Sequence, residues 1–272
     1  MAVASAIAVS MPLQTTNSRE GLTCYASGAL NDDLRLALKL ADLSDRITLR
    51  HFRGSFSVRT KADQTPVSEV DEEVEKAIRE RLDRERPEDA IVGEEFGKRG
   101  DGARRWIIDP IDATRNYIRG IPLFATLIAL DGQAGVVSAP ALNRRWWASR
   151  GQGAFCDGKP IRVSKVRTLA DAQIGYDSVV DFKPPDKFLA LLQKCGRARG
   201  FGDFWIHMLV AEGATEIAVE PQVAWWDMAA IQIIVEEAGG RFTSLDGQPR
   251  ADRGSGVSSN ALLHDTVLEA LR

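Results

Sequence analysis

Two aspartates stand three residues apart at the end of an apolar segment, in the stretch Trp106-Ile107-Ile108-Asp109-Pro110-Ile111-Asp112-Ala113-Thr114-Arg115-Asn116. The aromatic and β-branched residues that open this stretch favour a short buried strand. Pro110 has no N–H to give to a sheet, so we expect the strand to stop there. A helix is then expected to begin near Asp112, with Asp112 or Thr114 as its N-cap.

The two carboxylates allow two interpretations. At this spacing they converge on one small volume, where like charges repel unless a proton or a cation lies between them. A metal site is therefore the first hypothesis. Ordinary turn and cap chemistry is the second, because Asp-Pro and Asp-Ala-Thr also serve that purpose. The stretch alone leaves both open.

The composition is that of an ordinary soluble protein. The chain has 272 residues, 44% hydrophobic and 27% charged, enough for one large domain or two modest ones. Its net charge is −3 and no block of like charges occurs, so we expect no nucleic-acid surface. No segment approaches the roughly 20 consecutive apolar residues of a membrane span, so we expect no membrane partner.

Cysteine and histidine usage limits the metal chemistry. Three cysteines lie singly in the chain, which favours a reducing, cytoplasmic compartment over a disulfide framework. Only three histidines occur, so a His-rich zinc site is not expected. A metal here would be held by oxygen ligands, which are typical of magnesium, manganese and calcium.

Hydrophobic periodicity divides the chain into a tail and one folded region. Residues 1–30 lack regular periodicity, and no Lys or Arg precedes their apolar start, so we expect a disordered tail rather than a secretion signal. In residues 31–165 the pattern predicts helices packed on a largely antiparallel sheet. In residues 166–272 helices and strands alternate as in an α/β layer. We find no linker between these halves and expect a single domain over residues 31–272.

Several elements can be placed within these halves. Apolar residues at helical spacing predict one helix from residue 31 onward and another over about 68–82, after a polar loop at 61–68. Residues 123–130 and 134–139 are expected to form a hairpin around Asp131-Gly132.

Four carboxylates share a position at the end of a strand or the start of a helix: Glu94, Asp109, Asp112 and Asp227. Taken singly, Asp227 is most simply a helix N-cap, and Asp71 a favourable charge in the first turn of a helix. Glu94 and Glu95 could also form a solvated turn between glycines. Together, however, several carboxylates at the ends of elements are typical of a two-metal oxygen site.

Three motifs in this order resemble the inositol monophosphatase superfamily. They are Gly93-Glu94-Glu95, residues 106–116, and Trp226-Asp227-Met228-Ala229-Ala230 followed by Glu237-Ala238-Gly239-Gly240. Residues 137–148 and 201–204 are further similar to its actinobacterial histidinol-phosphate phosphatase branch. The resemblance covers residues from about 32 to the end. It implies a five-layered α-β-α-β-α sandwich of the inositol monophosphatase and fructose-1,6-bisphosphatase type.

The resemblance also implies a set of metal ligands. Glu94, Asp109 and the carbonyl of Ile111 would hold one magnesium ion, and Asp109, Asp112 and Asp227 a second. Glu94 would also contact a third ion where one is present, and manganese could replace magnesium. Lithium would inhibit such an enzyme.

The catalytic roles follow from the same resemblance. Thr114, paired with Asp71, would orient and deprotonate the attacking water, and Glu95 would support the surrounding water. The N–H groups of Ala113 and Thr114 would receive phosphate oxygens. Substrate contacts would come from Glu94, Asp112, Ala113, Thr114, Arg115, Arg199, Asp203, Glu220 and Asp227.

Two residues depart from the superfamily pattern. Alanine replaces the usual glycine at position 113, and the phosphate loop is expected to fit only if this residue is not left-handed. Arg115 stands where lysine is frequent and keeps the charge. Glu220 has a competing interpretation as a surface carboxylate before Pro221.

The function implied is a magnesium-dependent phosphomonoesterase that removes phosphate from L-histidinol phosphate in histidine biosynthesis, acting as a homodimer. One alternative is an inositol-1-phosphate or broad small-molecule phosphatase. Another is a catalytically silent relative that binds a ligand or a partner protein.

Overall fold

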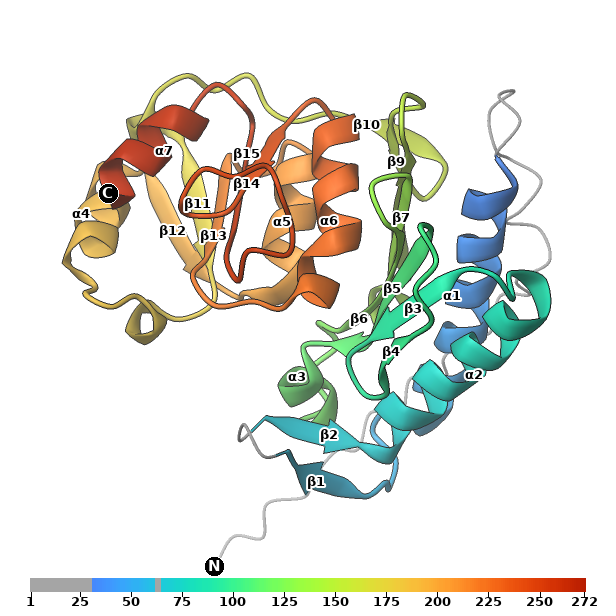
Figure 1. Cartoon of the computed structure of the whole chain (residues 1–272). Helices are drawn as coiled ribbons and strands as arrows, with labels where there is room; N and C mark the ends of the chain where they lie inside the picture. Colours follow the sequence, from blue (N-terminus) through green and yellow to red (C-terminus); the bar gives the residue numbers. More distant parts are fainter. Residues whose placement is uncertain (1–30, 62–64) are drawn as a thin grey trace, which may run out of the picture.

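Two β-sheets and three layers of helices alternate across the molecule (Figure 1). The structure, a computed structural model, describes residues 31–61 and 65–272. The expectation of a disordered tail over residues 1–30 lies outside the described residues. None of the helices in the described part combines the length and hydropathy needed to cross a membrane.

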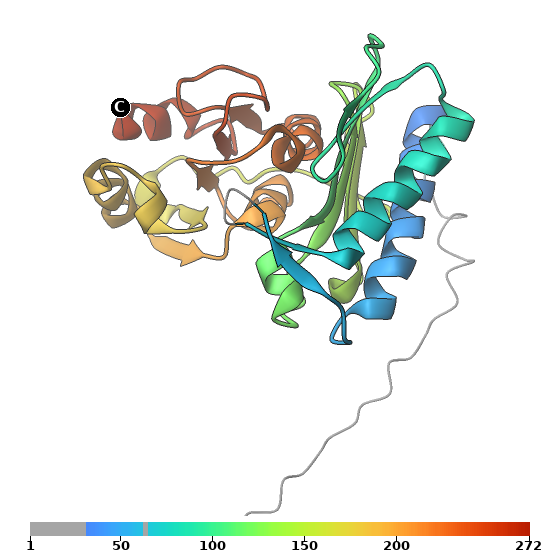
Figure 2. The same ribbon diagram turned by 60° about the horizontal axis from the view of Figure 1, so that its bottom comes forward.

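The first layer consists of α1 (Asp32–His51) and α2 (Glu69–Glu85), which run side by side on the outer face of the larger sheet (Figure 2). Asn31 caps α1, and its Oδ1 accepts the N–H of Leu34 at 2.7 Å. The predicted apolar stripe of α2 is confirmed, since Val70, Val74, Ile78 and Leu82 are fully buried. The stripe is interrupted by one buried acid, Glu75.

The larger sheet has eight strands in the order β10-β9-β8-β7-β6-β5-β3-β4. All neighbours are antiparallel except β3 and β5, so the predicted antiparallel character and the hairpin of β6 and β7 are confirmed. The strands are β3 (Ala90–Gly93), β4 (Gly97–Arg99), β5 (Arg105–Asp112), β6 (Ala125–Leu130), β7 (Ala134–Ala139), β8 (Arg144–Ser149), β9 (Ala154–Cys156) and β10 (Lys159–Ile161).

The central strand β5 does not stop at Pro110, as the sequence had suggested, but continues to Asp112. Its pairing with β6 shifts register between Asp109 and Asp112. Proline is tolerated at such an irregularity, because the N–H it lacks has no ladder partner there. The short helix α3 (Thr114–Ile118) follows directly.

A second correction concerns the polar segment after residue 60. Pro66–Ser68 forms strand β2, which pairs antiparallel with β1 (Val58–Thr60) rather than belonging to a loop. The two strands form a small separate sheet at the edge of the molecule (Figure 1).

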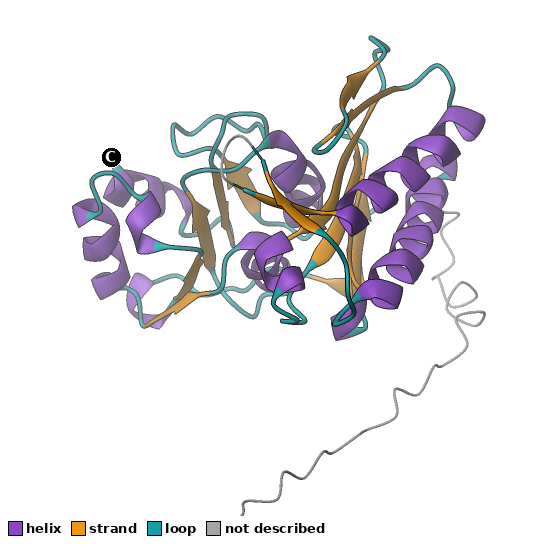
Figure 3. Ribbon diagram, turned by 90° about the horizontal axis from the view of Figure 1, so that it is seen from below, coloured by secondary structure: helices purple, strands orange, loops and turns teal. Residues whose placement is uncertain are grey.

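The second half supplies the other three layers (Figure 3). Helices α5 (Asp203–Ala211) and α6 (Trp225–Glu237) lie between the two sheets, while α4 (Asp186–Lys194) and α7 (His264–Leu271) cover the outer face of the five-stranded sheet. This sheet has the order β12-β11-β13-β15-β14. Its strands are β11 (Gln173–Tyr176), β12 (Arg197–Gly200), β13 (Ile217–Glu220), β14 (Arg241–Thr243) and β15 (Gly256–Ser259), and single 3-10 turns occur at Pro140–Leu142, Leu169–Asp171 and Val179–Asp181. The predicted α-β-α-β-α sandwich is confirmed.

Close packing sets the position of α6 over the larger sheet. A Cβ atom on Gly135 of β7 would lie only 2.7 Å from the carbonyl oxygen of Ala230, so only glycine allows the helix to approach this closely. Val137 and Ala139 of β7 are buried with the apolar side chains of α6 in one core between the sheets. The start of α6 is thereby held next to the end of β5, where the acidic residues lie.

Candidate active site

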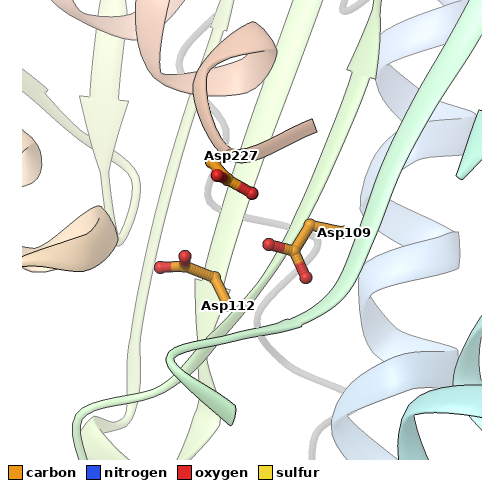
Figure 4. Close-up of side chains that lie close together, drawn as sticks. All are labelled: Asp109, Asp112 and Asp227. Atoms are coloured by element: carbon orange, nitrogen blue, oxygen red, sulfur yellow. The ribbon is translucent and has the colours of Figure 1, made fainter. Parts of the chain in front are cut away.

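Three carboxylates converge where β5 ends and α6 begins. Asp109, Asp112 and Asp227 each offer an oxygen within 4.8 Å of the others. Figure 4 shows Asp227 pointing from the start of α6 toward the two aspartates of β5. Asp109 and Asp112 are buried, with 2% and 7% of their surfaces exposed, so solvent screens their charges poorly.

The carboxylate cluster has the features of a cation site. Burial, and then the neighbouring charges of Glu94 and Asp112, raise the pKa of Asp109 well above its usual range. Burial likewise raises the pKa of Asp227 to about 7. In addition, Oδ1 of Asp109 is buried without any hydrogen-bond partner. Converging carboxylate oxygens with an unpartnered acceptor fit a hard divalent cation.

Asp227 is held in place by its own helix. Its Oδ2 accepts the N–H of Ala224 at 2.7 Å, and Ala224, not Asp227, is the N-cap residue of α6. The interpretation of Asp227 as an N-cap is therefore wrong by three positions, although the carboxylate does satisfy a free N–H at the helix start. One oxygen serves the helix and the other faces the cluster (Figure 4).

Asp71 and Thr114 meet beside this cluster. The hydroxyl of Thr114 lies 3.4 Å from Oδ1 of Asp71 and 2.9 Å from the carbonyl oxygen of Ile111. The other oxygen of Asp71 accepts the N–H of Ser68 at 2.9 Å. Burial raises the pKa of Asp71 to about 6, so the carboxylate is a stronger base than usual while remaining ionised at neutral pH.

Glu94 and Glu95 lie in the turn between β3 and β4, and two residues that sequence reasoning missed contact this turn. Fully buried Glu75 of α2 accepts the N–H of Glu95 at 2.7 Å and that of Phe96 at 3.2 Å. Lys61 places Nζ 2.7 Å from Glu94 Oε1 and 2.8 Å from Glu95 Oε1. Glu75 could have been found as an acid within an apolar helix stripe, whereas no signal marks Lys61.

These contacts and burial shift the pKa values of Glu95 and Lys61 at the turn. Burial raises the pKa of Glu95 to about 7, although the hydrogen bond from Lys61 opposes the shift. Burial alone would lower the pKa of Lys61, but its hydrogen bonds to the two glutamates raise it. Glu94 is paired with Lys61 and does not belong to the group of three carboxylates.

The loop after Asp112 departs from expectation. Ala113 adopts φ 64° and ψ 45°, the left-handed conformation that was expected to be incompatible with the phosphate loop. It is also the N-cap residue of α3, so the predicted caps Asp112 and Thr114 are wrong. Ala113 is the single residue between the end of β5 and the start of α3. Arg115 follows in the first turn of α3 and is exposed.

Glu220 is buried, which contradicts its interpretation as a surface carboxylate: only 5% of the residue is exposed. It ends β13, and its Oε1 accepts the N–H of Asp203 at 2.8 Å. The next N–H, of Phe204, donates to Oδ2 of Asp112 at 2.7 Å. The start of α5 thus links Glu220 to the carboxylate cluster. Burial, and then Glu220, raise the pKa of Asp203 well above its usual range.

Arg199 lies elsewhere. Its exposed guanidinium donates to the carbonyl of Ala198 at 2.8 Å and lines a pocket of about 250 Å³ with Arg197, Phe201 and Trp205. None of the cluster carboxylates lines that pocket. The structure therefore brings Asp203 and Glu220, but not Arg199, next to the cluster.

Comparisons with known proteins agree with this geometry. The model of the Inositol monophosphatase family matches residues 31–272. A histidinol-phosphatase of Streptomyces coelicolor is 48% identical, over 87% of this chain and 96% of that protein. One of Mycobacterium tuberculosis is 50% identical, over 89% and 98%. The solved structure of an inositol monophosphatase from Zymomonas mobilis is 32% identical and superposes with a TM-score of 0.81, covering 90% of this chain and 99% of that one.

Proposed function

Since the chain belongs to the inositol monophosphatase family, we propose that it is a magnesium-dependent phosphatase that hydrolyses L-histidinol phosphate to L-histidinol and phosphate. It is a phosphoric monoester hydrolase. The observation that carries the chemistry is the unpartnered Oδ1 of Asp109 beside Asp112 and Asp227. The choice of substrate is supported by the two histidinol-phosphatases, which are 48% and 50% identical in sequence to this chain.

Asp109, Asp112 and Asp227 would hold the cation, with Glu94 and the carbonyl of Ile111 as further ligands on the β3 and β5 side. Magnesium fits this all-oxygen set, and manganese would as well. When bound, such an ion neutralises phosphate charge and lowers the pKa of water. Lys61 contacts Oε1 of Glu94, and the other oxygen of this carboxylate would be the ligand of the ion.

The chain itself supplies the base. Thr114 accepts a hydrogen bond from the attacking water while its own hydroxyl donates to Asp71, whose raised pKa suits it to take up the proton. The N–H groups of Ala113 and Thr114 lie next to this pair and would receive phosphate oxygens, which requires that the loop binds phosphate with Ala113 left-handed, contrary to the condition expected from the sequence. Glu95 would support the surrounding water. Phosphoryl transfer needs little more than positioning and charge compensation.

The leaving group would lie toward Glu220 and Asp203. Histidinol phosphate carries an ammonium and an imidazole, and the carboxylates of these two residues complement both groups. Inositol offers only hydroxyl groups, which the same carboxylates could accept. That keeps an inositol-1-phosphate or broad phosphatase as the second candidate, which the solved inositol monophosphatase favours.

We further propose that residues 31–272 act as one domain, in the cytoplasm and as a homodimer. The singly placed cysteines suit a reducing compartment, and Cys156 and Cys195 are free thiols in the structure. Lithium is expected to inhibit the enzyme, and full activity in millimolar lithium would count against the proposed metal arrangement.

The test is phosphate release, with magnesium, from histidinol phosphate, inositol 1-phosphate, fructose 1,6-bisphosphate and a 3′-phosphonucleotide. We expect histidinol phosphate to be preferred by about 100-fold in kcat/KM, or roughly 2.7 kcal/mol of transition-state binding. A flat profile would establish a broad phosphatase instead. No release from any substrate, with metal present, would establish a silent relative.

A further inference from the structure

A buried histidine stands behind the carboxylate that faces the leaving group. His207 of α5 is fully buried, and both of its ring nitrogens are hydrogen-bonded. Nε2 lies 3.1 Å from Oε2 of Glu220, and Nδ1 lies 2.7 Å from Oγ of Ser258 in β15. None of the residues assigned above to metal, water or phosphate uses this imidazole.

The partners determine how the ring is oriented. The hydroxyl of Ser258 can donate to Nδ1, which leaves the proton of the ring on Nε2, where it donates to Glu220. The other oxygen of Glu220 accepts the N–H of Asp203 at 2.8 Å. Each carboxylate oxygen is therefore held by one donor, and the carboxylate plane of Glu220 is fixed from two sides.

Glu220 needs this support because its neighbours repel it. Asp203 opens α5, Asp112 at the end of β5 accepts the N–H of Phe204 in the same helix, and the charge of Glu220 also acts on Asp227. A buried carboxylate among other acids gains by rotating away from them, unless a donor holds it in place. His207 is the side-chain donor that the described residues offer to Glu220.

We propose that His207 is a positioning residue that fixes Glu220 toward the cationic part of the leaving group and so contributes to substrate choice. This inference rests on the proposed histidinol phosphate phosphatase function. His207 itself does not contact the substrate. It acts through the Nε2–H donor to the carboxylate of Glu220, and the hydroxyl of Ser258 can donate to Nδ1 of the same ring.

A purely structural role is the competing explanation, and the chain contains a matched control. His264 of α7 is also fully buried, with Nδ1 2.8 Å from Ser259 Oγ and Nε2 2.9 Å from Thr243 Oγ1. Ser258 and Ser259 are consecutive in β15 and point to opposite faces of the sheet. His264 thus has the same burial and the same kind of partners, but no carboxylate depends on it.

The test compares His207→Asn, His207→Gln and His264→Asn. Asparagine places its amide near the position of Nδ1, so it can keep the bond to Ser258 but cannot reach Glu220. Glutamine reaches the position of Nε2 and can donate to Glu220. For each variant kcat and KM are measured with histidinol phosphate and with p-nitrophenyl phosphate, which has no cation, and folding is checked by circular dichroism and thermal melting.

We expect His207→Asn to lower kcat/KM for histidinol phosphate by about 10- to 100-fold, mainly through KM, with less than about threefold change for p-nitrophenyl phosphate. His207→Gln should restore histidinol phosphate turnover to within about threefold of wild type. His264→Asn should leave the ratio of the two substrates unchanged. Equal losses on both substrates, or failure of glutamine to restore activity, would overturn the proposal.

A double-mutant cycle separates this proposal from the proposed function. If the wild-type enzyme prefers another phosphate ester, the histidinol phosphate assignment fails, and the cycle of His207→Asn with Glu220→Gln is measured on the preferred ester. Strong non-additivity, in which the double variant is no worse than Glu220→Gln alone, would still support positioning of Glu220. Additive losses would show that His207 does not act through Glu220.

Discussion

The hydroxyl of Thr114 lies 3.4 Å from Oδ1 of Asp71, although 43 residues separate them in the chain. Asp71 is in the first turn of α2, on the outer side of the larger sheet, and Thr114 opens α3 at the end of β5. The pair therefore forms only when α2 and the end of β5 are correctly packed. Because the Thr114–Asp71 pair lies close to the cluster of Asp109, Asp112 and Asp227, it is suited to accept a proton from water.

Replacement of Thr114 tests this pair. Thr114→Ala should lower kcat by about 10²- to 10⁴-fold, because the hydroxyl that relays the proton to Asp71 is lost. Magnesium affinity, measured by calorimetry, should change little. Thr114→Ser keeps the hydroxyl and should retain most of the activity. A large loss of magnesium affinity in Thr114→Ala would instead assign the residue to the metal site.

Replacement of Asp109 tests the cation site. Asp109→Asn should lose magnesium binding and nearly all turnover, yet in chelator its melting temperature should equal or exceed that of the wild type, because one buried charge among repelling carboxylates is removed. Asp101→Asn, at an exposed position, is the control and should change neither property. An unfolded Asp109→Asn protein would show that Asp109 has a role in the core instead.

The backbone at Ala113 gives a stability prediction. A left-handed alanine costs about 1 kcal/mol or more, which glycine avoids, while glycine makes the unfolded chain more flexible. We expect Ala113→Gly to stabilise the protein by about 0.5 kcal/mol and to keep its activity. We expect Ala113→Val to be clearly destabilising. Urea unfolding measures both. A destabilised Ala113→Gly variant would mean that the left-handed conformation is not adopted in solution.

Glu75 gives a prediction about the turn that carries Glu94. Glu75→Ala removes a fully buried carboxylate that accepts the N–H groups of Glu95 and Phe96, so we expect a loss of about 3 kcal/mol in unfolding free energy and weaker magnesium binding. Glu80→Ala, at an exposed position on the same helix, should change stability by less than about 0.5 kcal/mol. Similar effects of both substitutions would show that helix propensity, not the turn, is responsible.

The buried His264 predicts part of the acid sensitivity. Burial lowers its pKa from 6.5 to about 4, so the folded state disfavours the charged ring. Its contribution to stability is complete above pH 6.5 and is lost as the pH falls toward 4, with a slope of up to about 1.4 kcal/mol per pH unit. His264→Gln should therefore show a flatter stability profile between pH 6.5 and 4.5. Parallel profiles would contradict the assignment.

Local sequence signals predicted much of the fold and the three carboxylates that the structure brings together. Apolar periodicity placed α1, α2 and the β6–β7 hairpin, and the residues around β5 and the start of α6 carried the carboxylates. The errors arose where distant segments decide local structure. Pro110 stays in its strand because β6 pairs around it, and Pro66–Ser68 is a strand because β1 lies beside it.

The supporting residues were missed for the same reason. Glu75, Lys61 and His207 acquire their roles only from partners at least 13 residues away in the chain. A sequence pattern shows that a residue is charged, but not which backbone N–H or carboxylate folding brings to it. Tertiary contact is thus the information that the local pattern lacks.

Asp71 and Asp227 each occupy the third position of a helix, and each accepts the N–H of the residue just before that helix. The bond that starts the helix therefore also selects the rotamer of a functional carboxylate. These two side chains lose their conformational entropy when α2 and α6 form, and therefore not when the substrate binds. A shift of one residue in the start of either helix would therefore misdirect one of these carboxylates.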